Sequence, residues 1–144
     1  AVPAFAQGFY PDSISSDLHV QSMNGAMMDM PTTMSKCLAM GMPLGDVIAR
    51  STAVPARMIG HPELGHLSPG APGDVTLWNL REGAFGFKDS VGGRLRSDRR
   101  FECEMTILGG EVVWDLNARD GTAYGEIPFG EGIREGEFFI PPER

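Results

Sequence analysis

Three histidines and a scattering of carboxylates are the side chains in this sequence best suited to chemistry. His61 and His66 lie five residues apart in a Gly/Pro-rich stretch, a spacing that shares no helical face, so we expect exposed loop histidines. His19 lies two residues after Asp17. Asp17 itself follows residues 13–16, a short extended run that should form a buried strand. A carboxylate at the C-terminal mouth of such a strand is where α/β enzymes place catalytic groups.

Asp17 is therefore the strongest candidate that the residues alone provide. The alternative is that this carboxylate only caps a loop or the helix that follows. The remaining polar clusters favour ordinary structural roles. Four arginines between 94 and 100 are expected in a solvated segment between strands, pairing with neighbouring glutamates. The sequence contains neither a phosphate-binding loop nor a Gly-x-Ser-x-Gly nucleophile motif.

Composition limits the class of protein. The 144 residues hold 12 Lys+Arg against 19 Asp+Glu, a formal charge of −7, which argues against nucleic-acid binding. No apolar run reaches the roughly 20 residues of a membrane span. Cys37 and Cys103 are too far apart in sequence for a metal knuckle or a redox pair. A disulfide framework is equally unsupported, so we expect a reducing, cytoplasmic compartment. The length is also too short for a complete (β/α)₈ barrel of about 250 residues.

The elements that would position Asp17 follow from apolar spacing. The pattern predicts a short helix before Gly8, a helix after Pro31 with Thr32 or Thr33 as its N-cap, and further helices opening at Pro43 and Pro55.

Strands are predicted for the second half of the chain. They cover residues 75–80 and 101–107, and Gly109-Gly110 then turns the chain into residues 112–114. Phe101, Cys103, Met105 and Ile107 are expected on one face of their strand. Residues 120–144 show no period and read as an irregular Gly/Pro/acidic tail.

Five segments, in order and at the right spacing, resemble the amidohydrolase superfamily, most closely its deacetylase branch, often labelled dihydroorotase-like. Residues 8–19 (GFYPDSISSDLH) resemble the family's barrel strand 8 and its metal-binding aspartate. Residues 34–52 resemble the helices that follow strand 8 in the family, and residues 55–60 resemble its Pro-Ala element. Residues 65–75 resemble the turn by which the family's chain leaves the barrel, and residues 107–113 resemble its closing hairpin.

The resemblance implies an α/β fold: the C-terminal end of a (β/α)₈ TIM barrel, with strand 8 and its following helices, plus the C-terminal part of a small β-sandwich domain. The implied divisions are 1–64 for the barrel end, 65–119 for the small β domain and 120–144 for the tail. The family's His-x-His pair and its other metal-binding histidines have no counterpart here. We therefore expect the C-terminal portion of a longer metallohydrolase, inactive by itself.

The resemblance also implies a function for that longer protein. It would hydrolyse a small-molecule amide or ester with one or two divalent metal ions, zinc being the expected metal. Asp17 would bind a metal and move a proton, while His19 and Asn24 would contact the substrate. Deacetylation of an N-acyl or O-acyl compound is the first choice, and opening of a cyclic amide is the second.

Two alternatives of another kind remain: a non-catalytic structural remnant, or a subunit completed by a separate chain. A homo-oligomer of the full-length protein is a further expectation. No nucleic-acid or membrane partner is expected.

Overall fold

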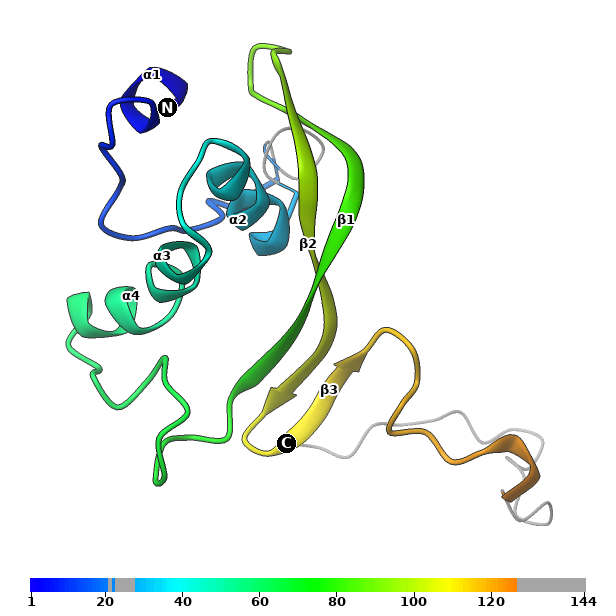
Figure 1. The fold of residues 1–144 in the computed structure, drawn as a ribbon. Helices are drawn as coiled ribbons and strands as arrows, with labels where there is room; N and C mark the ends of the chain where they lie inside the picture. Colours follow the sequence, from blue (N-terminus) through cyan, green and yellow to red (C-terminus); the bar gives the residue numbers. More distant parts are fainter. Residues whose placement is uncertain (21, 23–27, 127–144) are drawn as a thin grey trace.

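The computed structural model describes residues 1–20, 22 and 28–126. In chain order its elements are α1 (Val2–Phe5), α2 (Met30–Ala39), α3 (Leu44–Ala49), α4 (Ala53–Met58), β1 (Val75–Lys88), β2 (Arg94–Leu108), β3 (Glu111–Asp115) and the 3₁₀ turn η1 (Tyr124–Glu126). Figure 1 shows the four α-helices together on one side of a long, twisted β1–β2 hairpin, with β3 beside one end of β2. None of the helices in the described ranges is long and apolar enough to cross a membrane.

The predicted helices form, with shifted starts. Asp29, not Thr32 or Thr33, is the N-cap of α2, and its Oδ1 accepts a hydrogen bond of 2.7 Å from the Thr32 N–H. A carboxylate satisfies the free N–H groups of a first turn and also complements the positive end of the helix dipole. The expected N-cap was therefore wrong by three or four residues.

The sheet is longer than the alternating pattern predicted. β1 continues to Lys88 and β2 begins at Arg94, so the arginines at 94–100 lie within a strand rather than a connecting loop. Charged residues and glycines interrupt the apolar alternation in this part of the hairpin. The alternating pattern therefore does not predict that these two segments pair as strands. The three strands are antiparallel in the order β1-β2-β3, and Gly109-Gly110 makes the predicted tight turn with φ values of +60° and +87°.

The predicted apolar face of β2 is broken by a bulge. The register shifts between Leu77 and Trp78, which pair with Met105 and Cys103 respectively. Cys103 Sγ consequently lies 3.4 Å from Thr106 Oγ1, although side chains three residues apart in a regular strand point to opposite faces. Cys103 therefore shares a face with Thr106 rather than with Met105.

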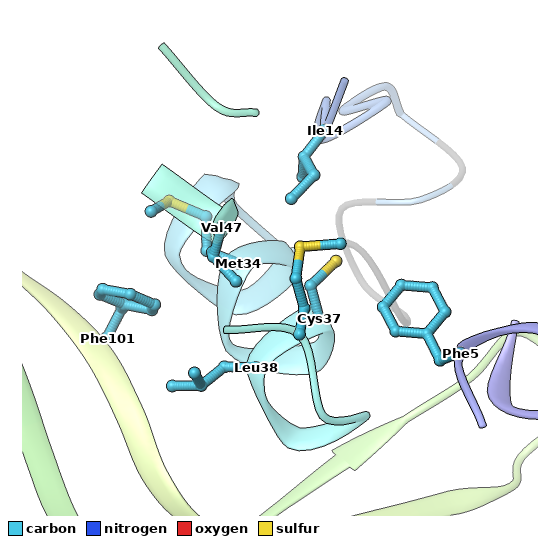
Figure 2. Packing of buried hydrophobic residues seen from close by; sticks show 8 residues of the cluster. Phe5, Ile14, Met34, Cys37, Leu38, Val47 and Phe101 are labelled. Carbon is cyan, nitrogen blue, oxygen red and sulfur yellow. The ribbon is translucent and has the colours of Figure 1, made fainter. Parts of the chain in front are cut away.

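The hydrophobic core is centred on α2. Figure 2 shows this helix between Phe101 of β2 and Phe5 of α1, with Ile14 and Val47 closing over it. One buried polar contact joins helix to sheet: Ser35, which is fully buried, accepts a 2.9 Å hydrogen bond from the Phe101 N–H and donates to Pro31 O at 2.6 Å. The core thus holds the segment before Asp17, through Ile14, against the same helix as the sheet.

The strand expected at residues 13–16 is not present. The Ile14 N–H donates to Arg50 O at 2.8 Å instead of to a neighbouring strand. No barrel strand occurs among the described residues, so the barrel and sandwich parts of the predicted fold stay predictions, as do the divisions at 64/65 and 119/120. Residues 127–144 of the expected tail lie outside the described part of the chain.

Candidate functional site

The segment leading to Asp17 is held by the helices that follow it in sequence. Arg50, the C-cap of α3, donates from Nη1 to Pro11 O at 2.6 Å and accepts the Ile14 N–H through its own carbonyl. Tyr10 Oη donates to Gly41 O at 3.2 Å. A charge-assisted hydrogen bond from a guanidinium is among the stronger contacts available to a backbone carbonyl. Arg50 is thus the main polar clamp on this segment.

Asp17 itself is exposed and has a backbone φ of +47°. The left-handed conformation raises the conformational energy of a residue with a Cβ, although Asp and Asn tolerate it better than most. Ser22 offsets this cost locally: its Oγ lies 2.9 Å from Asp17 O, to which it donates, and accepts the His19 N–H at 2.9 Å. The strained conformation presents the carboxylate at the bend of a short, hydrogen-bonded loop.

The other predicted substrate contacts have different outcomes. His19 lies in the same loop as Asp17 and is exposed. Asn24 lies outside the described residues. Ser22 and Arg50 also belong to this candidate site, because they hold the backbone around Asp17, and the sequence did not predict either role. No local pattern marks either of them, because both act on backbone atoms whose position depends on the fold.

A large apolar groove, about 1250 Å³ in volume, runs between α2 and the sheet. Met34, Trp78, Phe101, Cys103 and Trp114 contribute to its walls. Neither Asp17 nor His19 lines it. The groove and the candidate catalytic loop are therefore separate features in the described part of the molecule.

Two groups near the core have shifted pKa values. Burial raises the pKa of the Cys37 thiol, which favours the neutral form and makes this cysteine a poor nucleophile. Burial also lowers the pKa of Lys36, an effect that the nearby carboxylate of Asp89 partly offsets.

The two linker histidines form local contacts. His61 Nδ1 lies 2.8 Å from Glu63 Oε1, and His66 Nδ1 accepts the Ser68 N–H at 3.2 Å. The hydrogen bond to His61 lowers the pKa of the exposed Glu63 carboxyl. These contacts suit exposed loop residues, as the sequence predicts.

The described residues do not make a metal site by themselves. They contain no group of three or more His, Cys, Asp or Glu side chains placed to hold an ion. A structural or catalytic zinc site needs three or four protein ligands. Asp17 would have to be joined by ligands from outside the described ranges.

Curated relatives share much of this sequence. It is 38% identical over 113 residues to a deacetylase of Brucella anthropi and 37% identical over 113 residues to a deacetylase of Agrobacterium fabrum. A deacetylase of Enterococcus faecalis is 27% identical over the same length. Each match covers 78% of this chain but only 28% to 31% of the relative, so the chain spans about three tenths of their length. No family model matches the sequence.

Solved structures match in the same way. The fold is similar to an adenine deaminase, with a TM-score of 0.75 and 28% identity over 80% of this chain and 31% of the other. It is also similar to a dihydroorotase, with a TM-score of 0.72 and 36% identity over 79% of this chain and 31% of the other. Sequence and fold agree on the predicted relationship, and the chain belongs to the amidohydrolase superfamily, matching the C-terminal portion of its members.

Proposed function

We propose that a protein carrying this chain is a hydrolase of carbon–nitrogen or acyl bonds that removes an acetyl or related acyl group from a small molecule. The observation that carries the proposal is the 38% and 37% identity to two proteins named deacetylase. The chain spans 28% of each. By itself it supplies one candidate catalytic carboxylate, so activity would belong to the longer protein.

Asp17 is the group that we propose for proton transfer. A carboxylate near the scissile bond takes a proton from the attacking water and delivers it to the departing amine or alcohol. The left-handed backbone at Asp17 supports this role, because strained residues persist where the surroundings hold them and they concentrate at active sites. Ser22 and Arg50 would keep the carboxylate in place on either side of the bend.

A divalent metal, with zinc as the expected ion, would supply an activated water of lowered pKa when bound. Asp17 is the residue of this chain that we propose as one of its ligands. His19 and Asn24 are proposed to contact the substrate. A small-molecule amide or ester is the proposed substrate class, and a homo-oligomer of the full-length protein is a further proposal.

Opening of a cyclic amide is the second candidate. The observation that favours it is the 36% identity to a dihydroorotase structure with a TM-score of 0.72. Both reactions cleave an acyl–heteroatom bond with water and need the same base, so the residues of this chain do not separate them. A non-catalytic module, or a subunit completed by another chain, is the remaining alternative.

A substrate comparison separates these possibilities. The full-length, metal-loaded protein would be assayed with N-acetyl and O-acetyl amino and hydroxy acids, and in parallel with dihydroorotate and hydantoins. We expect acetate release with a kcat/KM at least about tenfold above that for ring opening, a difference of about 1.4 kcal/mol in transition-state stabilisation. Faster ring opening would favour the second candidate, and hydrolysis of neither class would contradict the proposed function.

A further inference from the structure

Positive charge is concentrated in the β1–β2 hairpin of this otherwise acidic chain. Residues 81–100 contain six of the 12 Lys and Arg residues but only three of the 19 Asp and Glu residues. The local charge is therefore +3, against −7 for the whole chain. A local positive charge on one element of an acidic protein attracts ligands of negative charge.

Part of this charge is neutralised by neighbouring carboxylates. Arg81 and Arg100 both contact Glu102, at 3.5 and 3.2 Å. Arg99 Nε lies 3.8 Å from the Asp98 carboxylate.

Three cations in the same hairpin have no such partner. Lys88, Arg94 and Arg96 form no ion pair within the described residues. The nearby Asp89 is engaged elsewhere: its Oδ1 accepts the N–H groups of Val91 and Gly93 at 3.0 and 2.6 Å. Asp89 also acts electrostatically on Lys36 of α2.

The strand register places the three unpaired cations on one face. Lys88 is directly opposite Arg94, and Gly86 is directly opposite Arg96. Because residues two apart in a strand point to the same face, Lys88, Arg94 and Arg96 surround Gly86, and all three are exposed. Like charges directly opposite each other destabilise a hairpin. We call Lys88, Arg94 and Arg96 the cationic face.

A hollow lies at this face. It has a volume of about 490 Å³ and is lined by Gly86, Phe87, Lys88, Gly92 and Arg94. Gly86 makes room for the Arg94 side chain beside the hollow, because a Cβ at that position would lie 3.0 Å from Arg94 Nε and 3.5 Å from its Nη2. The Arg94 guanidinium therefore lies across the strand over the glycine.

We propose that the cationic face binds the oxyanion group of a small molecule, a phosphate or a carboxylate, in the hollow that Gly86, Gly92, Lys88 and Arg94 line. The planar guanidinium of Arg94 offers paired N–H donors that match the oxygens of such a group, and Lys88 adds a point charge beside it. A bound anion also relieves the repulsion between Lys88 and Arg94. The site is separate from the loop of Asp17 and does not depend on the proposed hydrolase function.

The test is an NMR titration of the 144-residue chain with pyrophosphate and, separately, with succinate, at ionic strength held constant with chloride. We expect saturable shifts of the Gly86 and Gly92 amides and of the Arg94 Nε–H resonance. Tighter binding of pyrophosphate would identify a phosphate site, and tighter binding of succinate a carboxylate site. Shifts that are absent, or that stay linear with concentration for both anions, would overturn the proposal.

Variants distinguish a built site from diffuse charge. Arg94→Gln should weaken binding by about fivefold or more, as expected for losing a charge-assisted hydrogen bond of about 1 kcal/mol or more. Arg57→Gln makes the same change on the exposed surface of α4 and should have little effect. Gly86→Val keeps every charge but displaces the Arg94 guanidinium from its place over residue 86, and should also weaken binding. Equal weakening by Arg57→Gln, or unchanged binding by Gly86→Val, would contradict a site at Gly86.

Discussion

Asp17 lies at a bend that its neighbours hold in place from both sides. Arg50 fixes the backbone at Pro11 and Ile14, and Ser22 fixes it at Asp17 and His19. The carboxylate stays exposed, with its backbone in a left-handed conformation. Such an arrangement leaves the side chain available for a substrate while limiting the motion of its backbone, which is what an acid–base group requires.

Removal of the Ser22 hydroxyl tests whether the loop positions Asp17. In the full-length protein, Ser22→Ala should lower kcat by about fivefold, because one hydrogen bond contributes about 1 kcal/mol to holding the bend. KM should change less, and Ser22→Thr should restore part of the rate. Ser15→Ala, on an exposed residue of the same segment, is the matched control. A Ser22→Ala enzyme with wild-type kcat would show that the loop needs no such support.

Cys37 gives the protein an alkaline dependence of stability. Burial raises the folded-state pKa of its thiol above the ordinary value of 9.0. The unfolded chain therefore loses this proton first as the pH rises, and the free energy of unfolding falls from about pH 9 upward until the folded pKa is reached. Urea midpoints measured between pH 7 and about 10.5 should show this loss, and Cys37→Ala should reduce it. An equal alkaline slope in both proteins would contradict a buried, protonated thiol.

The packing of α2 on β2 determines how the elements fit together. The sequence predicted both elements, since Met34, Cys37 and Leu38 have helical spacing and residues 101–107 alternate strictly. The contact between them could not be predicted, because the Ser35 hydroxyl reaches Phe101 across 66 residues of sequence. Patterns of period 3.6 or 2 report which face is apolar, but not which polar atom will satisfy a particular backbone group.

Other differences at this level have local causes. The pairing of Leu77 with Met105 and of Trp78 with Cys103 leaves Glu104 of β2 as an extra residue, which offsets the alternation of side chains on that strand. No residue type marks the position of this bulge. The outer half of the hairpin was missed because Gly83, Gly86 and the charged residues resemble a loop. Asp29 was overlooked as a cap because two threonines, equally good in principle, follow it.

Ser35→Ala tests the junction of helix and sheet. The change leaves the buried Phe101 N–H without an acceptor, so the free energy of unfolding should fall by about 1–3 kcal/mol. Ser51→Ala is a suitable control, because that hydroxyl only donates to Val47 O one turn earlier. We expect it to change stability by less than about 0.5 kcal/mol. Urea denaturation of the two variants makes the comparison, and equal losses would refute a special role for Ser35.

The molecule as a whole exposes much apolar surface for its size. Phe9, Val20, Leu67 and Val91 are 73%, 82%, 76% and 89% exposed, and Met58 of α4 is 61% exposed. The chain spans about three tenths of its curated relatives, which is consistent with contacts that it does not contain.

The isolated chain should therefore lack hydrolase activity. It offers Asp17 as a single proposed metal ligand, and its described residues assemble no metal site. Purified chain would be supplied with zinc and assayed for acetate release, while bound metal is measured by elemental analysis. We expect no turnover above background and no stoichiometric metal. Turnover with one or two bound ions would show that the 144 residues form a complete enzyme.

The most direct measurement is the effect of Asp17→Asn on kcat, KM and bound metal in the full-length protein. Asn keeps the shape, one coordinating oxygen and the tolerance for φ of +47°, but it cannot accept the proton. If Asp17 is the proton-transferring ligand, kcat should fall by at least ~10²–10⁴ while metal content falls only modestly. His19→Asn should instead act mainly on KM. If Asp17 only caps a loop, the Asn variant should be nearly silent, since Asn caps as well as Asp. A fully metallated, fully active Asp17→Asn protein would contradict the catalytic assignment.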